Sequence, residues 1–336
     1  MSVEDIAVVG AGSYGSCLAM LFGRAGHRVS LWARNAETAA TMQESREAAA
    51  YLPGHRLPST VTVTSDLEAA VRGKRFIVGV TPSHGIREVL GRAAQWLDPE
   101  AIVINASKGL EDGTLMTIDR VYAEIFPKQI AERATYLSGP TFATEIAAGL
   151  PAAIVLAGRD NPTTTAAQEA LTSLHFRIYR TDDVIGVLMG GALKNVVAIG
   201  AGISDGLGFG SNTRVALMTR GLAEITRVGV AMGANPLTFA GLSGMGDLVL
   251  TCSGDASRNR RVGLALGQGK KMPEILAEMR QVAEGVKTAK VAKELAAKLG
   301  VDAPIIDAMY CIIHEGVPVR DAITKLLTRA VRSERD

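Results

Sequence analysis

The sequence predicts an α/β N-terminal domain with a doubly wound parallel sheet, followed by an all-α C-terminal domain. Short apolar runs alternate with helical patterns in the first half of the chain, whereas strand-like runs disappear after about Asp183. Strand–helix alternation is typical of a parallel sheet with helices on both faces. The 336 residues are enough for about two domains, and we predict these domains at residues 1–182 and 183–336.

The expected strands are short runs rich in apolar and β-branched residues. They cover residues 6–9, 28–32, 61–63, 76–80, 101–105 and 135–137, with later additions at 152–156 and 177–179. Helical spacing of apolar residues lies between them, as in 16–25 and 86–96. Gly26 is a suitable C-terminal cap for the first of these helices.

From Asp183 onward, glycine and proline residues separate successive helical patterns. The expected helices cover residues 184–203, 213–230, 259–266, 273–278, 284–299, 304–314 and 320–330. In the first of them, Lys194 and Asn195 are the only polar side chains. Its length could span a bilayer, but a central lysine and the Gly190-Gly191 pair disfavour that arrangement. We therefore expect no integral membrane segment, but a helix buried inside a soluble protein together with its lysine.

Composition excludes several classes of protein. Hydrophobic residues make up 47% of the chain and charged residues 21%, as in ordinary globular proteins. The formal net charge of +2 implies no large basic surface for nucleic acid.

Cys17, Cys252 and Cys311 are too far apart for a zinc site or a disulfide framework, so we expect no metal and a reducing compartment. The N-terminus shows no signal peptide, which favours a cytoplasmic location.

A GxGxxG motif connects the first expected strand to the first expected helix, with the sequence Gly10-Ala11-Gly12-Ser13-Tyr14-Gly15. This context predicts a Rossmann-type turn that binds a dinucleotide. Gly10 permits the tight turn, Gly12 lets the backbone approach a pyrophosphate, and Gly15 allows close packing of the helix. The free N–H groups at the start of the helix would then bind the anion.

The second expected strand ends just before Arg34, where NAD-selective sites usually carry an acidic residue. A guanidinium at this position fits a ribose 2′-phosphate through two hydrogen bonds. We therefore predict NADP(H) as the preferred cofactor. If Arg34 is only a solvated loop residue, NAD(H) remains possible.

Polar residues follow three of the expected strands, at the sheet edge where ligands bind in open α/β folds. Thr81-Pro82-Ser83 follows the fourth strand, Ser107-Lys108-Gly109 the fifth, and Ser138-Gly139-Pro140-Thr141 the sixth. Lys108 should therefore lie on the same edge as the GxGxxG turn, the alternative being an ordinary surface lysine.

Lys194 lies in an otherwise apolar run and is either buried or extended to solvent along its aliphatic chain. Burial would lower its pKa and suit it to proton transfer near neutral pH. Reduction of a ketone needs a hydride on carbon and a proton on oxygen, and a lysine ammonium can supply the proton. Asn195 would orient the substrate or the lysine.

A second polar cluster consists of Gly244-Met245-Gly246-Asp247 and Ser257-Arg258-Asn259-Arg260-Arg261. Asp247 would hold the buried lysine or a substrate hydroxyl. Ser257 is typical of an N-cap, which places Arg258 and Asn259 in the first turn of a helix. Basic residues there oppose the helix dipole, so a bound phosphate would relieve the conflict, although a solvated helix start is the alternative. We expect Arg260-Arg261 to be ordinary surface charge.

Seven ordered motifs together resemble bacterial NAD(P)-dependent glycerol-3-phosphate dehydrogenases. They are residues 10–19, Ser107-Lys108-Gly109, 139–143, 190–202, 205–224, 244–252 and 257–263. The resemblance extends nearly end to end, as far as Glu315-Gly316. It implies a Rossmann-type domain, a helical domain, and a site in the cleft between them. It also implies reversible, NADPH-preferring reduction of dihydroxyacetone phosphate to sn-glycerol 3-phosphate, which supplies phospholipid synthesis.

By this resemblance, Lys194 is the proton donor in ketone reduction, and Lys108 contacts both cofactor and substrate. The predicted substrate site comprises Lys108, Gly139, Thr141, Lys194, Asn195, Asp247, Ser257, Arg258 and Asn259. The predicted cofactor site comprises Gly10, Gly12, Ser13, Tyr14, Gly15, Arg34, Lys108, Ala143, Arg258, Val282 and Glu284. Ala143, Val282 and Glu284 rest on the resemblance alone. Leu188 and Ser211 depart from the family pattern, which usually has polar or acidic residues there.

Other functions remain compatible with these residues. A dehydrogenase of the same architecture could act on a hydroxy acid or a ketopantoate-like carboxylate, because an arginine binds either anion. A non-catalytic NADPH-sensing protein would need the GxGxxG turn but no buried Lys194. An interaction protein could use the long apolar helix as a dimer face, so a homodimer is possible.

Overall fold

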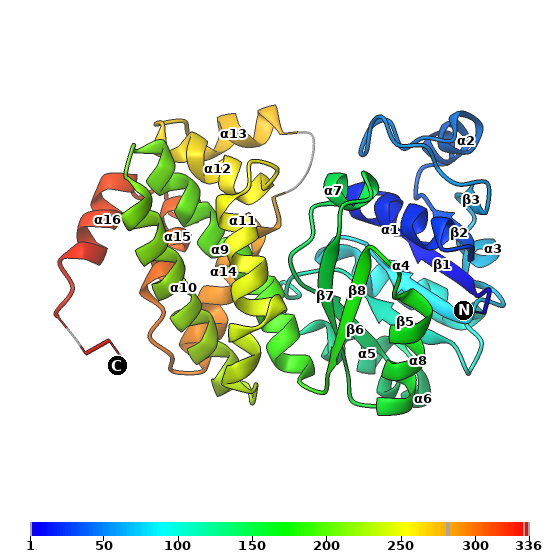
Figure 1. Ribbon diagram of the computed structural model, residues 1–336. Helices are drawn as coiled ribbons and strands as arrows, with labels where there is room; N and C mark the ends of the chain where they lie inside the picture. Colours follow the sequence, from blue (N-terminus) through cyan, green and yellow to red (C-terminus); the bar gives the residue numbers. More distant parts are fainter. Residues whose placement is uncertain (1, 280–282, 332, 335–336) are drawn as a thin grey trace.

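The computed structural model describes residues 2–279, 283–331 and 333–334 and shows a sheet part beside a helical part (Figure 1). In the described residues the sheet has eight strands in the order β3-β2-β1-β4-β5-β6-β7-β8. The strands are β1 (Asp5–Val9), β2 (Arg28–Trp32), β3 (Val61–Thr64), β4 (Phe76–Gly79), β5 (Ile102–Asn105), β6 (Thr135–Ser138), β7 (Ala152–Gly158) and β8 (Phe176–Thr181). Every expected strand is confirmed, with ends that differ by at most two residues from the predicted ones.

Helices cover both faces of the sheet, as expected for a doubly wound fold. Within β1, Ile6 and Val8 join one hydrophobic cluster, whereas Ala7 and Val9 join the cluster on the other face. The first cluster is covered by α1 (Ser13–Arg24), α2 (Ala36–Ser45), α7 (Ala143–Ala147) and α8 (Asn161–Leu171). The second is covered by α3 (Leu67–Val71), α4 (Ile86–Ala93), α5 (Ile118–Ile125) and α6 (Lys128–Glu132).

The expected parallel sheet is confirmed for every pair of strands but one. β6 and β7 pair antiparallel, with Thr135 beside Gly158 and Ser138 beside Val155, while all the other pairs are parallel. After β6 the chain turns through the short helix α7 and re-enters the sheet from the same edge, so no crossover is made. α8 then provides a crossover between β7 and β8, which are parallel again.

The helical part is built around α9 (Val184–Gly206). Its other helices are α10 (Ser211–Ala231), α11 (Asp247–Ser253), α12 (Arg258–Gly267), α13 (Met272–Glu278), α14 (Glu284–Lys298), α15 (Pro304–His314) and α16 (Val319–Leu327). The expected helices are confirmed, with small differences at their ends. The π-helical turn Leu242–Gly246 and α11 had no counterpart in the predicted elements, because this glycine-rich stretch carries little apolar periodicity.

α9 is long and apolar enough to cross a membrane by length and composition, with a mean hydropathy of 1.8. However, 94% of its apolar window is buried inside the protein. The prediction of a buried core helix is therefore confirmed. For the same reason this helix is not available as a dimer face, so that part of the interaction-protein hypothesis was wrong.

Candidate functional site

The GxGxxG turn has the geometry that its sequence predicts. Gly10 has a φ of +122°, and a Cβ added there would lie 2.8 Å from the Val80 carbonyl oxygen. A Cβ on Gly15 would lie 1.8 Å from the Gly10 carbonyl oxygen, so α1 approaches the turn closely. A Cβ on Gly12 would meet no described atom within 4 Å. The turn therefore leaves open space beside the N-terminus of α1, which fits the pyrophosphate of a dinucleotide.

Three other residues of the predicted cofactor site, Ser13, Tyr14 and Arg34, lie in or near this turn. Ser13 donates a hydrogen bond of 2.7 Å from Oγ to the carbonyl oxygen of Tyr51, which ties the loop after α2 to the start of α1. Burial raises the pKa of the Tyr14 hydroxyl, so this group stays protonated. Arg34 is exposed directly after β2, on the same edge of the sheet.

Lys108 lies at the carboxyl edge of the sheet, three residues beyond the end of β5. Its Nζ donates to the Gly139 carbonyl oxygen at 3.0 Å and to Asp247 Oδ2 at 2.6 Å. Thr141 Oγ1 donates to the same Gly139 oxygen at 3.3 Å. The side chain of Lys108 is 15% exposed, so the alternative of an ordinary surface lysine was wrong.

Lys194 is buried near the middle of α9, with 6% of its surface exposed. Its Nζ donates to Asp247 Oδ1 at 2.5 Å and to Thr251 Oγ1 at 2.7 Å. Burial and, to a smaller extent, the Lys108 charge lower the pKa of Lys194, Asp247 raises it, and the net result is a pKa of about 8. The amine is therefore held in a protein interior at a pKa suited to proton exchange near neutral pH.

Glycines in α9 bring this lysine close to the sheet. A Cβ on Gly190 would lie 2.5 Å from the Ser243 carbonyl oxygen. A Cβ on Gly191 would lie 2.8 Å from Ser138 Oγ. The Gly190-Gly191 pair thus lets the π-helical turn and the end of β6 contact the helix backbone one turn before Lys194.

The first turn of α12 adds a polar surface to the same region. Ser257 caps the helix and accepts a hydrogen bond of 3.2 Å from the Arg260 N–H, as predicted. Asn259 donates from Nδ2 to Asn195 Oδ1 at 2.9 Å and accepts from the Gly285 N–H at 2.9 Å. Asn195 is therefore bound to Asn259, and the orientation of Lys194 is left to Asp247 and Thr251.

Comparison with known proteins shows which family has this sequence and fold. Residues 5–164 match the family profile described as NAD-dependent glycerol-3-phosphate dehydrogenase N-terminus, and residues 183–324 match the profile described as its C-terminus. The chain belongs to the NAD-dependent glycerol-3-phosphate dehydrogenase family. It is therefore an oxidoreductase with a nicotinamide cofactor, and the predicted family, fold class and enzyme class are confirmed.

Two relatives match over almost their whole length. A glycerol-3-phosphate dehydrogenase (NAD(P)+) from Geobacter sp. strain M21 is 52% identical over 331 residues, 98% of this chain and 99% of that protein. The crystal structure of glycerol-3-phosphate dehydrogenase from Coxiella burnetii is 38% identical with a TM-score of 0.93, covering 97% of this chain and 99% of that one. A ketopantoate reductase from Ralstonia eutropha, 16% identical with a TM-score of 0.60 over 96% and 99% of the chains, shares the fold alone.

Glu284 was predicted from the family resemblance alone, because no local sequence pattern marks it. Glu284 begins α14, and burial raises the pKa of its carboxyl group. The charges of Arg258, Lys194 and Lys108 oppose this rise, which places the carboxylate near all three cations. Ala143 begins α7 after β6 and is partly exposed. Val282 lies outside the described residues.

Two further residues have environments in the structure that the sequence did not predict. Thr251 was not singled out, although its position four residues after Asp247 places both on one face of a helix. Arg260 was expected to be surface charge, and this was wrong. Its side chain is only 13% exposed and forms an ion pair of 2.7 Å with Asp205, because α12 packs against the end of α9.

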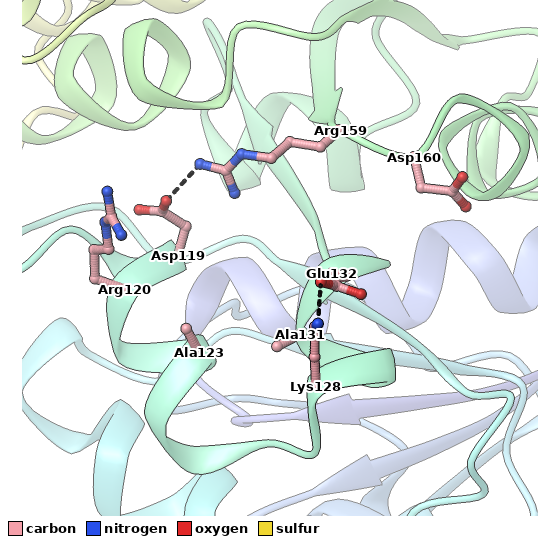
Figure 2. A pocket seen from close by; sticks show the side chains of 8 residues that line it. All are labelled: Asp119, Arg120, Ala123, Lys128, Ala131, Glu132, Arg159 and Asp160. Atoms are coloured by element: carbon pink, nitrogen blue, oxygen red, sulfur yellow. Dashed lines mark hydrogen bonds and ion pairs between the residues drawn. The ribbon is translucent and has the colours of Figure 1, made fainter.

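A separate cavity of about 700 Å³ lies away from this site (Figure 2). It is lined by Asp119, Arg120, Ala123, Lys128, Ala131, Glu132, Arg159 and Asp160. These residues lie near the start of β6 and the end of β7, on the sheet edge opposite Lys108. Arg159 pairs with Asp119 at 2.7 Å and Lys128 with Glu132 at 3.7 Å. None of the predicted site residues, including Lys108 and Lys194, lines this cavity.

Proposed function

We propose that this enzyme reduces dihydroxyacetone phosphate to sn-glycerol 3-phosphate, reversibly, with NADPH preferred over NADH. The observation that carries the proposal is the buried Lys194 amine, held by Asp247 next to Lys108 at the carboxyl edge of the sheet. The relatives named glycerol-3-phosphate dehydrogenase (NAD(P)+) support the substrate. The product would supply phospholipid synthesis in the cytoplasm.

The cofactor would lie along the GxGxxG turn and supply the hydride to the carbonyl carbon. The open space at Gly12 and the N–H groups at the start of α1 would receive the pyrophosphate. Gly10, Gly15, Ser13 and Tyr14 would shape this surface. The exposed Arg34 would bind the ribose 2′-phosphate, which is the basis for the NADPH preference. Lys108, Ala143, Arg258, Val282 and Glu284 would complete the cofactor site.

Lys194 would donate a proton to the substrate carbonyl oxygen as that oxygen gains negative charge. Asp247 would keep the ammonium aligned and would balance the positive charge of the two lysines. Arg258, Asn259 and the capped start of α12 would bind the phosphoryl group, since both the guanidinium and the first-turn N–H groups attract anions. Gly139, Thr141, Asn195 and Ser257 would line the remaining substrate surface.

In this proposal, the two parts of the chain have different roles. Residues 1–182 would bind the cofactor, and residues 183–336 would supply the proton and the anion site. The substrate would then lie between them, where Lys108 from the sheet part meets Asp247 from the helical part. The arrangement would bring hydride donor and proton donor to opposite atoms of one carbonyl group.

The deciding experiment follows oxidation of NADPH and NADH with dihydroxyacetone phosphate, unphosphorylated dihydroxyacetone and ketopantoate. We expect rapid turnover with the phosphorylated ketone, at least about 100-fold slower turnover without the phosphoryl group, and a lower KM for NADPH than for NADH. Preference for ketopantoate would instead support the hydroxy-acid alternative. Binding of NADPH without turnover of any ketone would support a non-catalytic sensor.

A further inference from the structure

Asp205 occupies an electrostatically unusual position at the end of α9. A carboxylate in the last turn of a helix is disfavoured by the helix dipole. Asp205 is nevertheless only 12% exposed, and two arginines from different helices bind it. Arg260 of α12 donates from Nε at 2.9 Å and from Nη2 at 2.7 Å. Arg214 of α10 donates from Nη1 at 3.1 Å. The cluster therefore joins three helices through one carboxylate.

The two helices α9 and α12 meet backbone to backbone along a seam of glycines. A Cβ on Gly202 would lie 2.0 Å from the Arg260 carbonyl oxygen. A Cβ on Gly263 would lie 1.9 Å from the Ile199 carbonyl oxygen, and one on Gly267 would lie 2.5 Å from that of Ile203. Position 199 thus faces 263 and position 203 faces 267, so the helices run parallel. The glycines therefore allow the close approach of the two helix backbones.

Polar contacts at two levels fix the position of α12 along α9. Near the middle of α9, Asn195 binds Asn259. At its end, Asp205 binds Arg260, whose own N–H is bonded to the cap residue Ser257. Arg258 directly precedes Asn259 and Arg260, in the same first turn. The Asp205–Arg260 ion pair therefore joins that turn to the end of α9, and Arg260 also pairs with the exposed Asp255 at 2.8 Å.

We propose that Asp205 is a positioning residue that sets the phosphoryl-binding turn of α12 at the correct distance from Lys194. The inference rests on the function proposed above, in which Arg258 and Asn259 bind the phosphoryl group. Asp205 does not itself touch the substrate in this scheme. It acts by holding Arg260, so that the binding energy of the phosphoryl group is used to place the carbonyl oxygen at the lysine.

The test compares Asp205→Asn with the wild-type enzyme on phosphorylated and unphosphorylated dihydroxyacetone. We expect kcat/KM for the phosphorylated ketone to fall about tenfold or more, since a misplacement of about 1 Å can cost about 100-fold. The value for unphosphorylated dihydroxyacetone should change little, because that substrate does not use the turn. Arg260→Lys keeps the charge but loses the two-nitrogen contact, and it should reproduce part of the effect.

The matched control is Glu224→Gln, the same carboxylate-to-amide change at a buried site in the helical part. Glu224 accepts hydrogen bonds from the Ile305 and Ile306 N–H groups at the start of α15. This variant should lower the melting temperature while leaving the ratio of the two kcat/KM values unchanged. If Asp205→Asn and Arg260→Lys reduce both values equally, or neither, the positioning role is wrong. A wild-type enzyme without preference for the phosphorylated ketone would overturn the proposed function as well.

Discussion

One carboxylate, Asp247, contacts both lysines of the site. It is 1% exposed, and its two oxygens accept from Lys108 and Lys194 at 2.6 and 2.5 Å. Two ammonium groups this close would repel each other in an interior without the intervening charge. The carboxylate therefore stabilises the buried ammonium of Lys194 and fixes its position, while burial keeps the pKa of this lysine low enough for proton transfer.

Removal of the Lys194 amine tests its proposed chemical role. We expect Lys194→Ala to bind NADPH normally and to lose ketone reduction by about 100-fold to 10,000-fold, the usual contribution of a general acid. NADPH binding is measured by fluorescence titration and reduction by NADPH consumption. Lys298→Ala, which changes an exposed lysine on α14, is the control. Near-normal turnover in Lys194→Ala would reject the role.

The pKa of about 8 at Lys194 predicts opposite pH profiles for the two directions. Reduction needs the protonated amine, so its kcat/KM should fall as pH rises through about 8, by about tenfold per unit beyond it. Oxidation of glycerol 3-phosphate needs the neutral amine and should rise over the same range. Parallel rate measurements between about pH 6 and 10 check this. The same slope in both directions would contradict the assignment.

Arg34 is the residue on which the predicted cofactor preference depends. Arg34→Ala should raise the KM for NADPH by about tenfold, because a charge-assisted contact to the 2′-phosphate is lost. The KM for NADH should stay within about twofold, since that cofactor lacks the phosphate. Steady-state kinetics with both cofactors provides the measurement, and the thermal midpoint of the variant controls for misfolding. Equal effects on both would remove Arg34 from the phosphate site.

At the scale of elements, the turn between β1 and α1 contains glycines in two different environments. Gly15 packs against the Gly10 carbonyl, whereas Gly12 borders open space. The same substitution at the two positions therefore has different physical consequences. In the proposed cofactor site, the N–H groups at the start of α1 would bind the pyrophosphate, and the glycines would leave room for the ligand and for the helix.

We expect Gly15→Ala to destabilise the protein by about 1–3 kcal/mol, because the new methyl group must displace backbone. Gly12→Ala should change stability by about 1 kcal/mol or less, yet weaken NADPH binding by about tenfold or more. Chemical denaturation and fluorescence titration measure the two quantities for each variant. Similar stability losses in both variants would show that the turn is not packed as described.

At the scale of the whole molecule, α9 links the two parts of the chain. Val184, Val187 and Leu188 in its first turns belong to a cluster of the sheet part, and its remaining core residues belong to the helical cluster. In return, Leu110 from the loop after β5 belongs to the helical cluster. Each part therefore buries apolar side chains of the other, which couples their stability.

This exchange of core residues predicts a single cooperative unfolding transition for both parts. Calorimetry should show one peak, and saturating NADPH should move that whole peak to higher temperature, because ligand binding stabilises the folded state. Leu110→Ala should lower the free energy of unfolding by about 2–5 kcal/mol while keeping one transition. Two separate peaks in the wild-type protein, only one of them shifted by NADPH, would contradict the coupling.

Much of the fold was predictable because it depends on neighbours in sequence. The strands, the GxGxxG turn, the Ser257 cap and the burial of Lys194 all follow from local patterns of apolar, glycine and capping residues. These features need only the periodicity of a helix or strand and the φ that a glycine permits. The chemistry expected of a buried lysine was likewise available before the structure.

Only the tertiary structure decided which partners these residues have. Asp247 is 53 residues from Lys194 and 139 from Lys108, and no local pattern links such distant side chains. The same holds for Arg260 with Asp205, and for the antiparallel pairing of β6 with β7. Sequence by itself determined the elements and the kinds of chemical groups, because both are set within a few residues. The packing of the helices and the sheet brings Lys108, Lys194 and Asp247 together at one site, and this packing involves residues from the whole chain.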